Sequence, residues 1–136
     1  MPAPKRFPSG KDRVKLEAIK VLLVEDDPVF MTLVLSMLET RSFAVERAVS
    51  AEEALTILKT RNFDLLITDL KMEGLGGVGL IQALMLSGAF PKKRIVVITG
   101  EAPKSADCVW VREQGIPLVE KPFGMKSLFE AVDSLL

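Results

Sequence analysis

The chain lacks histidine entirely and has a single cysteine, Cys108, among its 136 residues. Without histidine, the chain itself cannot carry a His-based catalytic dyad, a histidine metal ligand or a phosphohistidine. One cysteine excludes an internal disulfide framework and leaves too few thiols for a structural zinc site. These absences exclude several kinds of site and fit a protein of a reducing compartment.

The chain also lacks a net charge, because 18 basic residues balance 18 acidic ones. A broad nucleic-acid interface needs a clear basic excess, so we expect no direct nucleic-acid binding. No apolar run approaches the roughly 20 residues of a membrane span, and the N-terminus has no apolar signal-peptide core. The sequence therefore predicts a soluble, cytoplasmic protein without membrane contact.

The basic residues are unevenly placed, since residues 1–20 carry a net charge of +4. Residues 1–17 hold three prolines and most of that excess. Such a stretch is more typical of a solvated tail than of a DNA-binding arm. We predict a flexible basic tail over 1–17 and one domain over 18–136, which is long enough for a core of two or three layers.

Strand-like and helix-like segments alternate through this domain. Strands are predicted at 19–24, 43–48, 65–68, 95–98 and 116–119, and helices at 28–40, 51–58, 80–85, 104–114 and 125–136. This alternation predicts an α/β fold, in which helices cover both faces of a parallel sheet. Segment 43–48 alternates apolar and charged residues and segment 116–119 contains a proline, so both should be edge strands. The order 2-1-3-4-5, known from flavodoxin-like sheets, places both at the edges of one five-stranded sheet.

Polar residues that could perform chemistry follow four of the five predicted strands. They are Glu25 and Asp26, Asp69, Thr99 and Lys121. Each alone is more often a cap or turn residue, but the carboxyl ends of parallel strands lie at one edge, so these residues should converge. Neighbouring carboxylates raise each other's pKa unless a cation lies between them, and their hard oxygens suit Mg²⁺. A lysine and a hydroxyl beside that cation favour phosphoryl transfer onto a carboxylate.

Four motifs of the chain occur at a characteristic spacing. They are Val-Leu-Leu-Val-Glu-Asp-Asp, Phe-Asp-Leu-Leu-Ile-Thr-Asp-Leu-Lys-Met, Ile-Val-Val-Ile-Thr-Gly and Glu-Lys-Pro-Phe. Thr99 lies 30 residues after Asp69, and Lys121 lies 22 residues after Thr99. In these motifs and this spacing, residues 19–136 resemble the receiver domain of two-component response regulators.

The resemblance implies a role for each of these residues. Asp69 is the phosphoacceptor, and Thr99 and Lys121 bind the phosphoryl oxygens. Asp26 is a direct Mg²⁺ ligand and Glu25 a second acid that acts through water. The resemblance also implies that the backbone carbonyl of Lys71 completes the metal ligands and that the Lys121–Pro122 peptide bond is cis.

A mechanism and partners are implied in the same way. Asp69 attacks the phosphohistidine of a histidine kinase or histidine phosphotransfer protein, and water later hydrolyses the acyl phosphate. Phosphorylation would change the face made by the fourth helix, fifth strand and fifth helix, where a downstream protein binds. The chain is then a signalling switch rather than an enzyme, and a homodimer is compatible with that role.

Several positions depart from the pattern of the family. Leu118 stands where many receivers have an aromatic switch residue, so the output could run through another element. The glycine-rich segment 73–79 is predicted to be a loop, and its part 73–77 should be unusually mobile. Lys71 and Glu101 either bridge over Asp69 and slow hydrolysis, or are two solvated charges.

Other functions remain open from the sequence. The chain could be a stand-alone receiver or a receiver cut from a longer hybrid histidine kinase. A phosphohydrolase of the haloacid dehalogenase type would need a second acid two residues after Asp69, where Lys71 stands. A flavin mononucleotide binder would need a Ser/Thr-rich loop after the first strand, where this chain has three acids.

Overall fold

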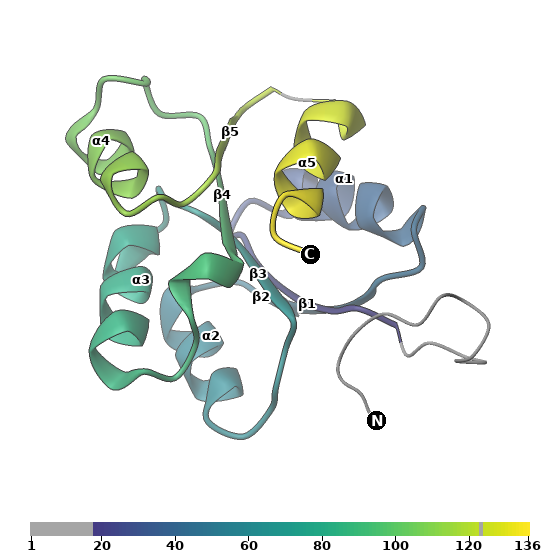
Figure 1. The fold of residues 1–136 in the computed structure, drawn as a ribbon, viewed down its shortest axis with the longest axis horizontal. Helices are drawn as coiled ribbons and strands as arrows, with labels where there is room; N and C mark the ends of the chain where they lie inside the picture. Colours follow the sequence, from purple (N-terminus) through teal and green to yellow (C-terminus); the bar gives the residue numbers. More distant parts are fainter. Residues whose placement is uncertain (1–17, 123) are drawn as a thin grey trace.

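The computed structural model describes residues 18–122 and 124–136, and strands and helices alternate along them (Figure 1). The prediction of a tail over 1–17 lies outside the described residues. The strands are β1 Lys20–Val24, β2 Ala44–Ala48, β3 Leu65–Asp69, β4 Ile95–Thr99 and β5 Leu118–Glu120. The helices are α1 Pro28–Glu39, α2 Ala51–Leu58, α3 Gly76–Ser87, α4 Ala106–Glu113 and α5 Met125–Asp133, with a 3-10 turn η1 at Lys92–Arg94.

The strands form one parallel sheet in the order β2-β1-β3-β4-β5, which confirms the predicted topology. Helices α1 and α5 cover one face, and α2, α3 and α4 cover the other (Figure 1). Strands β1 and β3 are neighbours, so their carboxyl ends lie next to each other. The sheet therefore brings together residues that are far apart in the sequence.

The two hydrophobic clusters explain the continuous apolar strands. Successive side chains of a strand point to opposite faces of the sheet. In β1, Leu22 and Val24 pack with α2, α3 and α4, while Val21 and Leu23 pack with α1 and α5. A strand covered on both faces must therefore be apolar at every position, as β1, β3 and β4 nearly are.

Side chains cap the starts of helices α1 and α2. Asp27 caps α1 by accepting hydrogen bonds from the backbone N–H groups of Val29 and Phe30. Ser50 caps α2 and accepts from the N–H of Glu53 at 3.0 Å. The Glu53 carboxylate reaches back to the N–H of Val49, at 2.7 Å, instead of closing the capping box on Ser50.

The glycine-rich segment after β3 differs from the prediction. Helix α3 begins at Gly76, so Gly76, Gly77 and Gly79 belong to a helix rather than to a loop. A Cβ atom at Gly77 would overlap the backbone carbonyl oxygen of Asp69 and lie 2.7 Å from the Cα of Leu70. Gly77 thus permits α3 to pack against the end of β3, and this tertiary contact overrides its poor helix propensity.

Smaller differences concern the edges of the sheet. Strand β5 covers Leu118–Glu120 rather than 116–119, because Pro117 precedes the strand instead of lying within it.

Within residues 18–122 and 124–136, no helix combines the length and the hydropathy that crossing a bilayer requires.

Candidate functional site

Three carboxylates gather at the carboxyl edge of the sheet. Glu25 and Asp26 directly follow β1, and Asp69 is the last residue of the neighbouring β3. One oxygen of each lies within 4.8 Å of one oxygen of the others. Glu25 is 1% exposed and Asp69 4% exposed, whereas Asp26 faces solvent. The cluster is therefore buried at its base and open at one side.

Lys121 provides the positive charge of this site. Its ammonium lies 2.9 Å from Asp69 Oδ2 and 3.1 Å from Glu25 Oε1. The backbone N–H of Lys121 donates to the carbonyl of Thr99 at 2.7 Å, and the Lys121–Pro122 bond is cis, the isomer that the resemblance implies. On its other side, the ammonium lies 3.9 Å from the centroid of the Phe30 ring, a cation–π contact.

Burial and charge shift the proton affinities of this group. Burial raises the pKa of Glu25 above its ordinary value, and the nearby charge of Asp69 adds to this effect. Hydrogen bonds from the Asp27 N–H and from Lys121 oppose the rise. Burial alone would lower the pKa of Lys121, but the hydrogen bond and charge of Asp69, together with those of Glu25, outweigh it and raise that pKa. The acids thus hold Lys121 in its charged form.

The backbone around Asp69 is held from several sides. Asp69 Oδ1 accepts from the N–H of Leu70 at 2.7 Å, and the Thr68 hydroxyl donates to the Asp69 carbonyl at 2.8 Å. Gly77 N–H donates to the Leu70 carbonyl at 2.9 Å. The Asp69 carboxylate therefore has one oxygen on the backbone and the other on Lys121, which fixes its direction.

Thr99 ends β4 at the same edge and is fully buried. Its hydroxyl accepts from the backbone N–H of Glu101 at 3.0 Å. The Glu101 carboxylate accepts from the Ser105 hydroxyl at 3.0 Å, and that hydroxyl caps α4 by accepting from the Cys108 N–H at 3.1 Å. A chain of three hydrogen bonds therefore connects Thr99 with the start of α4.

The two residues that could tune hydrolysis, Lys71 and Glu101, form no ion pair with each other among the described residues. Lys71 is exposed. The carboxylate of Glu101 bonds to Ser105 instead. Leu118 is half-buried and packs against the cluster beneath α2, α3 and α4.

The donor set fits a hard divalent cation such as Mg²⁺. Glu25, Asp26 and Asp69 supply carboxylate oxygens, the ligands that Mg²⁺ prefers, and Asp26 is accessible to solvent. After burial, the charge of Asp69 is the next largest cause of the raised pKa of Glu25, so the two acids repel each other. A cation at this edge would relieve the remaining repulsion.

Three residues near the site were not assigned to it from the sequence. Phe30 has helical periodicity typical of a core residue, yet its ring contacts Lys121. Gly77 lies in a segment for which the sequence predicts a loop, although it contacts the backbone of Asp69. Glu52 accepts from the N–H of Leu75 at 3.0 Å and so holds the segment after β3. Of these three residues, only Gly77 has a signal in the sequence. It belongs to the pair Gly76-Gly77, and glycines are typical of positions where two backbones approach closely.

Comparison with known proteins agrees with this geometry. The family described as "Response regulator receiver domain" matches residues 21–133. Transcriptional regulatory protein GlrR of Escherichia coli (strain K12) is 30% identical over 119 residues, which are 85% of this chain and 26% of GlrR. Chemotaxis protein CheY of Pseudomonas aeruginosa is 27% identical over 119 residues, 86% of this chain and 95% of CheY.

A solved structure extends the comparison. Response regulator TrrA from Thermotoga maritima, in complex with Mg²⁺-BeF, superimposes with a TM-score of 0.73 at 27% identity, over 87% of this chain and 99% of TrrA. The chain belongs to the response regulator receiver domain family of two-component systems. Proteins of this family act as phosphorylated signalling switches between histidine kinases and downstream targets. The chain spans about a quarter of the length of GlrR and nearly all of CheY.

Proposed function

We propose that this domain is switched by phosphorylation of Asp69. The observation that carries the proposal is the double contact of Lys121 with the buried carboxylates of Asp69 and Glu25. A cation beside a nucleophilic carboxylate can bind the oxygens of an incoming phosphoryl group. Asp69 is held rigidly but remains beside the solvent-facing Asp26, so a donor can reach it.

The acids of the site would hold the metal ion. Glu25, Asp26 and Asp69, with the backbone carbonyl of Lys71, are its ligands in this proposal, and Glu25 acts through water. When bound there, Mg²⁺ supplies positive charge that offsets the approach of an anionic phosphoryl group to an acidic cluster. This assignment is supported by the closeness of the three carboxylates.

The phosphoryl donor in this proposal is a phosphohistidine on a histidine kinase or histidine phosphotransfer protein, because the chain has no histidine of its own. An oxygen of the Asp69 carboxylate forms a bond to phosphorus as the phosphorus–nitrogen bond breaks. The electron pair of that bond stays on the imidazole nitrogen. Lys121 and the hydroxyl of Thr99 bind the phosphoryl oxygens. Attack of water on the phosphorus then releases inorganic phosphate and restores the carboxylate.

A small phosphodonor tests the assignment of Asp69. Incubation with acetyl phosphate and Mg²⁺ should add one phosphoryl group, seen by intact mass, with acetate as the leaving group. Asp69→Asn should abolish the adduct, since an amide is a far weaker nucleophile. Asp26→Asn should slow its formation, and chelation of Mg²⁺ should do the same. The absence of an adduct, or an adduct that survives Asp69→Asn, would contradict the proposal.

The hydrogen bonds from Thr99 to Glu101, Ser105 and Cys108 offer a route for the output. When the Thr99 hydroxyl turns toward a phosphoryl oxygen, its bond with the Glu101 N–H must change. Glu101 is bonded to the residue that caps α4, so the start of that helix should respond. This route requires no aromatic side chain at Leu118, and it ends on the α4-β5-α5 face to which we assign the downstream protein.

Removal of the Glu101 carboxylate from this series of hydrogen bonds should weaken the response of α4 to phosphorylation. Glu101→Ala leaves the Ser105 cap intact but deletes its bond to the carboxylate. We expect the phosphorylation-dependent NMR shifts of the α4 amides to fall by roughly a factor of two or more. The phosphorylated fraction by intact mass should stay the same. Lys104→Ala, an exposed change in the same loop, is the control. Unchanged α4 shifts in Glu101→Ala would rule out this route.

A further inference from the structure

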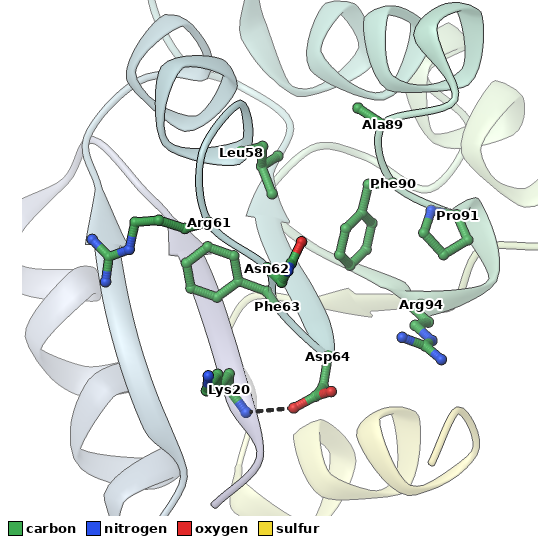
Figure 2. Close-up of a pocket in the computed structure, with 10 residues that line it drawn as sticks. All are labelled: Lys20, Leu58, Arg61, Asn62, Phe63, Asp64, Ala89, Phe90, Pro91 and Arg94. Atoms are coloured by element: carbon green, nitrogen blue, oxygen red, sulfur yellow. Dashed lines mark hydrogen bonds between the residues drawn. The ribbon is translucent and has the colours of Figure 1, made fainter. Parts of the chain in front are cut away.

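A pocket lies at the edge of the sheet opposite to Asp69 (Figure 2). The start of β1, the segment between α2 and β3, and the segment between α3 and β4 form its walls. Its volume is about 350 Å³, within the range of small-molecule sites. Nothing in the proposed phosphorylation of Asp69 uses this pocket.

The charged side chains around the pocket are mainly cationic. Lys20, Arg61 and Arg94 line it together with one acid, Asp64. Asp64 Oδ2 accepts from the backbone N–H of Lys20 at 2.9 Å, and Arg61 pairs with Glu46 at 2.9 Å. Among the described residues, the ammonium of Lys20 and the guanidinium of Arg94 form no ion pair. Beside the carboxylate of Asp64, the pocket therefore offers two cationic groups that form no ion pair.

The remaining walls are apolar and partly aromatic. Phe90 is 5% exposed and packs with Leu58 into the core, so it forms a fixed floor. The rings of Phe63 and Phe90 both lie beside the hollow, with the side chain of Asn62 between them (Figure 2). The guanidinium of Arg61 lies 5.9 Å from the centroid of the Phe63 ring. Such walls suit a planar group, because aromatic and guanidinium faces both stack on rings.

We propose that this pocket binds a small planar anion, an aromatic or heteroaromatic ring that carries a phosphate or a carboxylate. Lys20 and Arg94 would bind the anionic group, and Phe63 and Phe90 would contact the ring. Cationic side chains that outnumber the single acid of the pocket favour an anion, and Arg can bind phosphate or carboxylate through two parallel hydrogen bonds. The pocket is too small for a folded partner, and its enclosed aromatic floor distinguishes it from a merely basic surface.

Adenosine monophosphate and benzoate are suitable probes, because they present the two anionic groups on planar rings. Each is titrated without Mg²⁺ into the ¹⁵N-labelled full chain, so that the acidic edge cannot bind the nucleotide through a metal. At least one probe should give saturable shifts of the amides of Phe63, Asp64 and Arg94. Inorganic phosphate and adenosine alone should bind more weakly, since phosphate lacks the planar ring and adenosine lacks the anionic group.

Variants distinguish binding in this pocket from nonspecific attraction by surface charge. Lys20→Gln with Arg94→Gln should weaken binding at least roughly tenfold, and Arg94→Gln alone tests the same point with a single exposed substitution. Lys104→Gln, an exposed lysine elsewhere, should leave the affinity unchanged. The proposal is overturned if neither probe gives saturable shifts at these amides. It is also overturned if the Gln variants bind as tightly as the parent, or if Lys104→Gln weakens binding equally.

Discussion

Replacing Lys121 with methionine should destabilise the metal-free protein by about 3 kcal/mol and should raise its affinity for Mg²⁺. The ammonium contacts Asp69 and Glu25, whose side chains are almost completely buried, and the Lys121 side chain is itself only 14% exposed. Without it, two buried carboxylates face each other with no cation, which is costly to the folded state. Methionine keeps much of the length of lysine and can still contact the Phe30 ring, so the charge is the main change.

The opposite signs of the two effects make this prediction specific. Lys121 and a metal ion bound at the proposed site would compete for the same carboxylate oxygens, so removal of one should favour the other. Urea unfolding with and without Mg²⁺ should show a large loss of stability that the metal partly restores, while calorimetry measures the metal affinity. Formation of the acyl phosphate should slow, because Lys121, the proposed ligand of the phosphoryl oxygens, is lost. Lys126→Met, at an exposed pair with Glu130, is the control and should change none of these. A lower Mg²⁺ affinity in Lys121→Met would show that Lys121 does not oppose the metal.

The convergence of the acids and the lysine was predictable because it depends on topology. A continuous apolar run predicts a strand buried on both faces, and strands that alternate with helices predict a parallel sheet. In such a sheet, the residues that follow the strands lie at the same carboxyl edge. The structure indeed brings Asp69, Glu25 and Lys121 into contact there. No side-chain geometry was needed for this result, only the position of each residue at the end of its strand.

The details that the sequence did not predict depend on contacts between distant residues. The Glu101 carboxylate points toward Ser105, which donates a hydrogen bond to it. The position of Glu101 two residues after Thr99 does not show whether its partner is Ser105 or Lys71. The periodicity of α1 places Phe30 on the inner side of the helix, but it does not show that the neighbour there is a lysine ammonium. Local propensity also favours a loop where Gly77 in fact belongs to α3, because only the tertiary contact with β3 explains a glycine there.

That contact leads to the second large effect, at Gly77. Both Gly77 and Gly79 have helical backbones in α3, so alanine at either should favour the helix by up to about 1 kcal/mol if propensity alone decided. At Gly77, however, the new Cβ would overlap the carbonyl of Asp69 and approach the Cα of Leu70. Neither neighbour is a side chain that can rotate away. We therefore expect Gly77→Ala to destabilise the protein by about 1–3 kcal/mol.

A displacement of the backbone by the new Cβ should also reach Asp69, the proposed phosphoacceptor. A shift of Asp69 away from Lys121 should lower the rate of phosphorylation by acetyl phosphate by roughly tenfold to a hundredfold, because small misplacements of reacting groups are costly. Gly79→Ala is the matched control in the same helix, since its Cβ meets only the side chain of Leu75, which is exposed and free to rotate. It should leave the rate unchanged and should not destabilise the protein. Urea unfolding and intact mass give both quantities, and equal effects of the two substitutions would mean that helix propensity, not packing against β3, governs this segment.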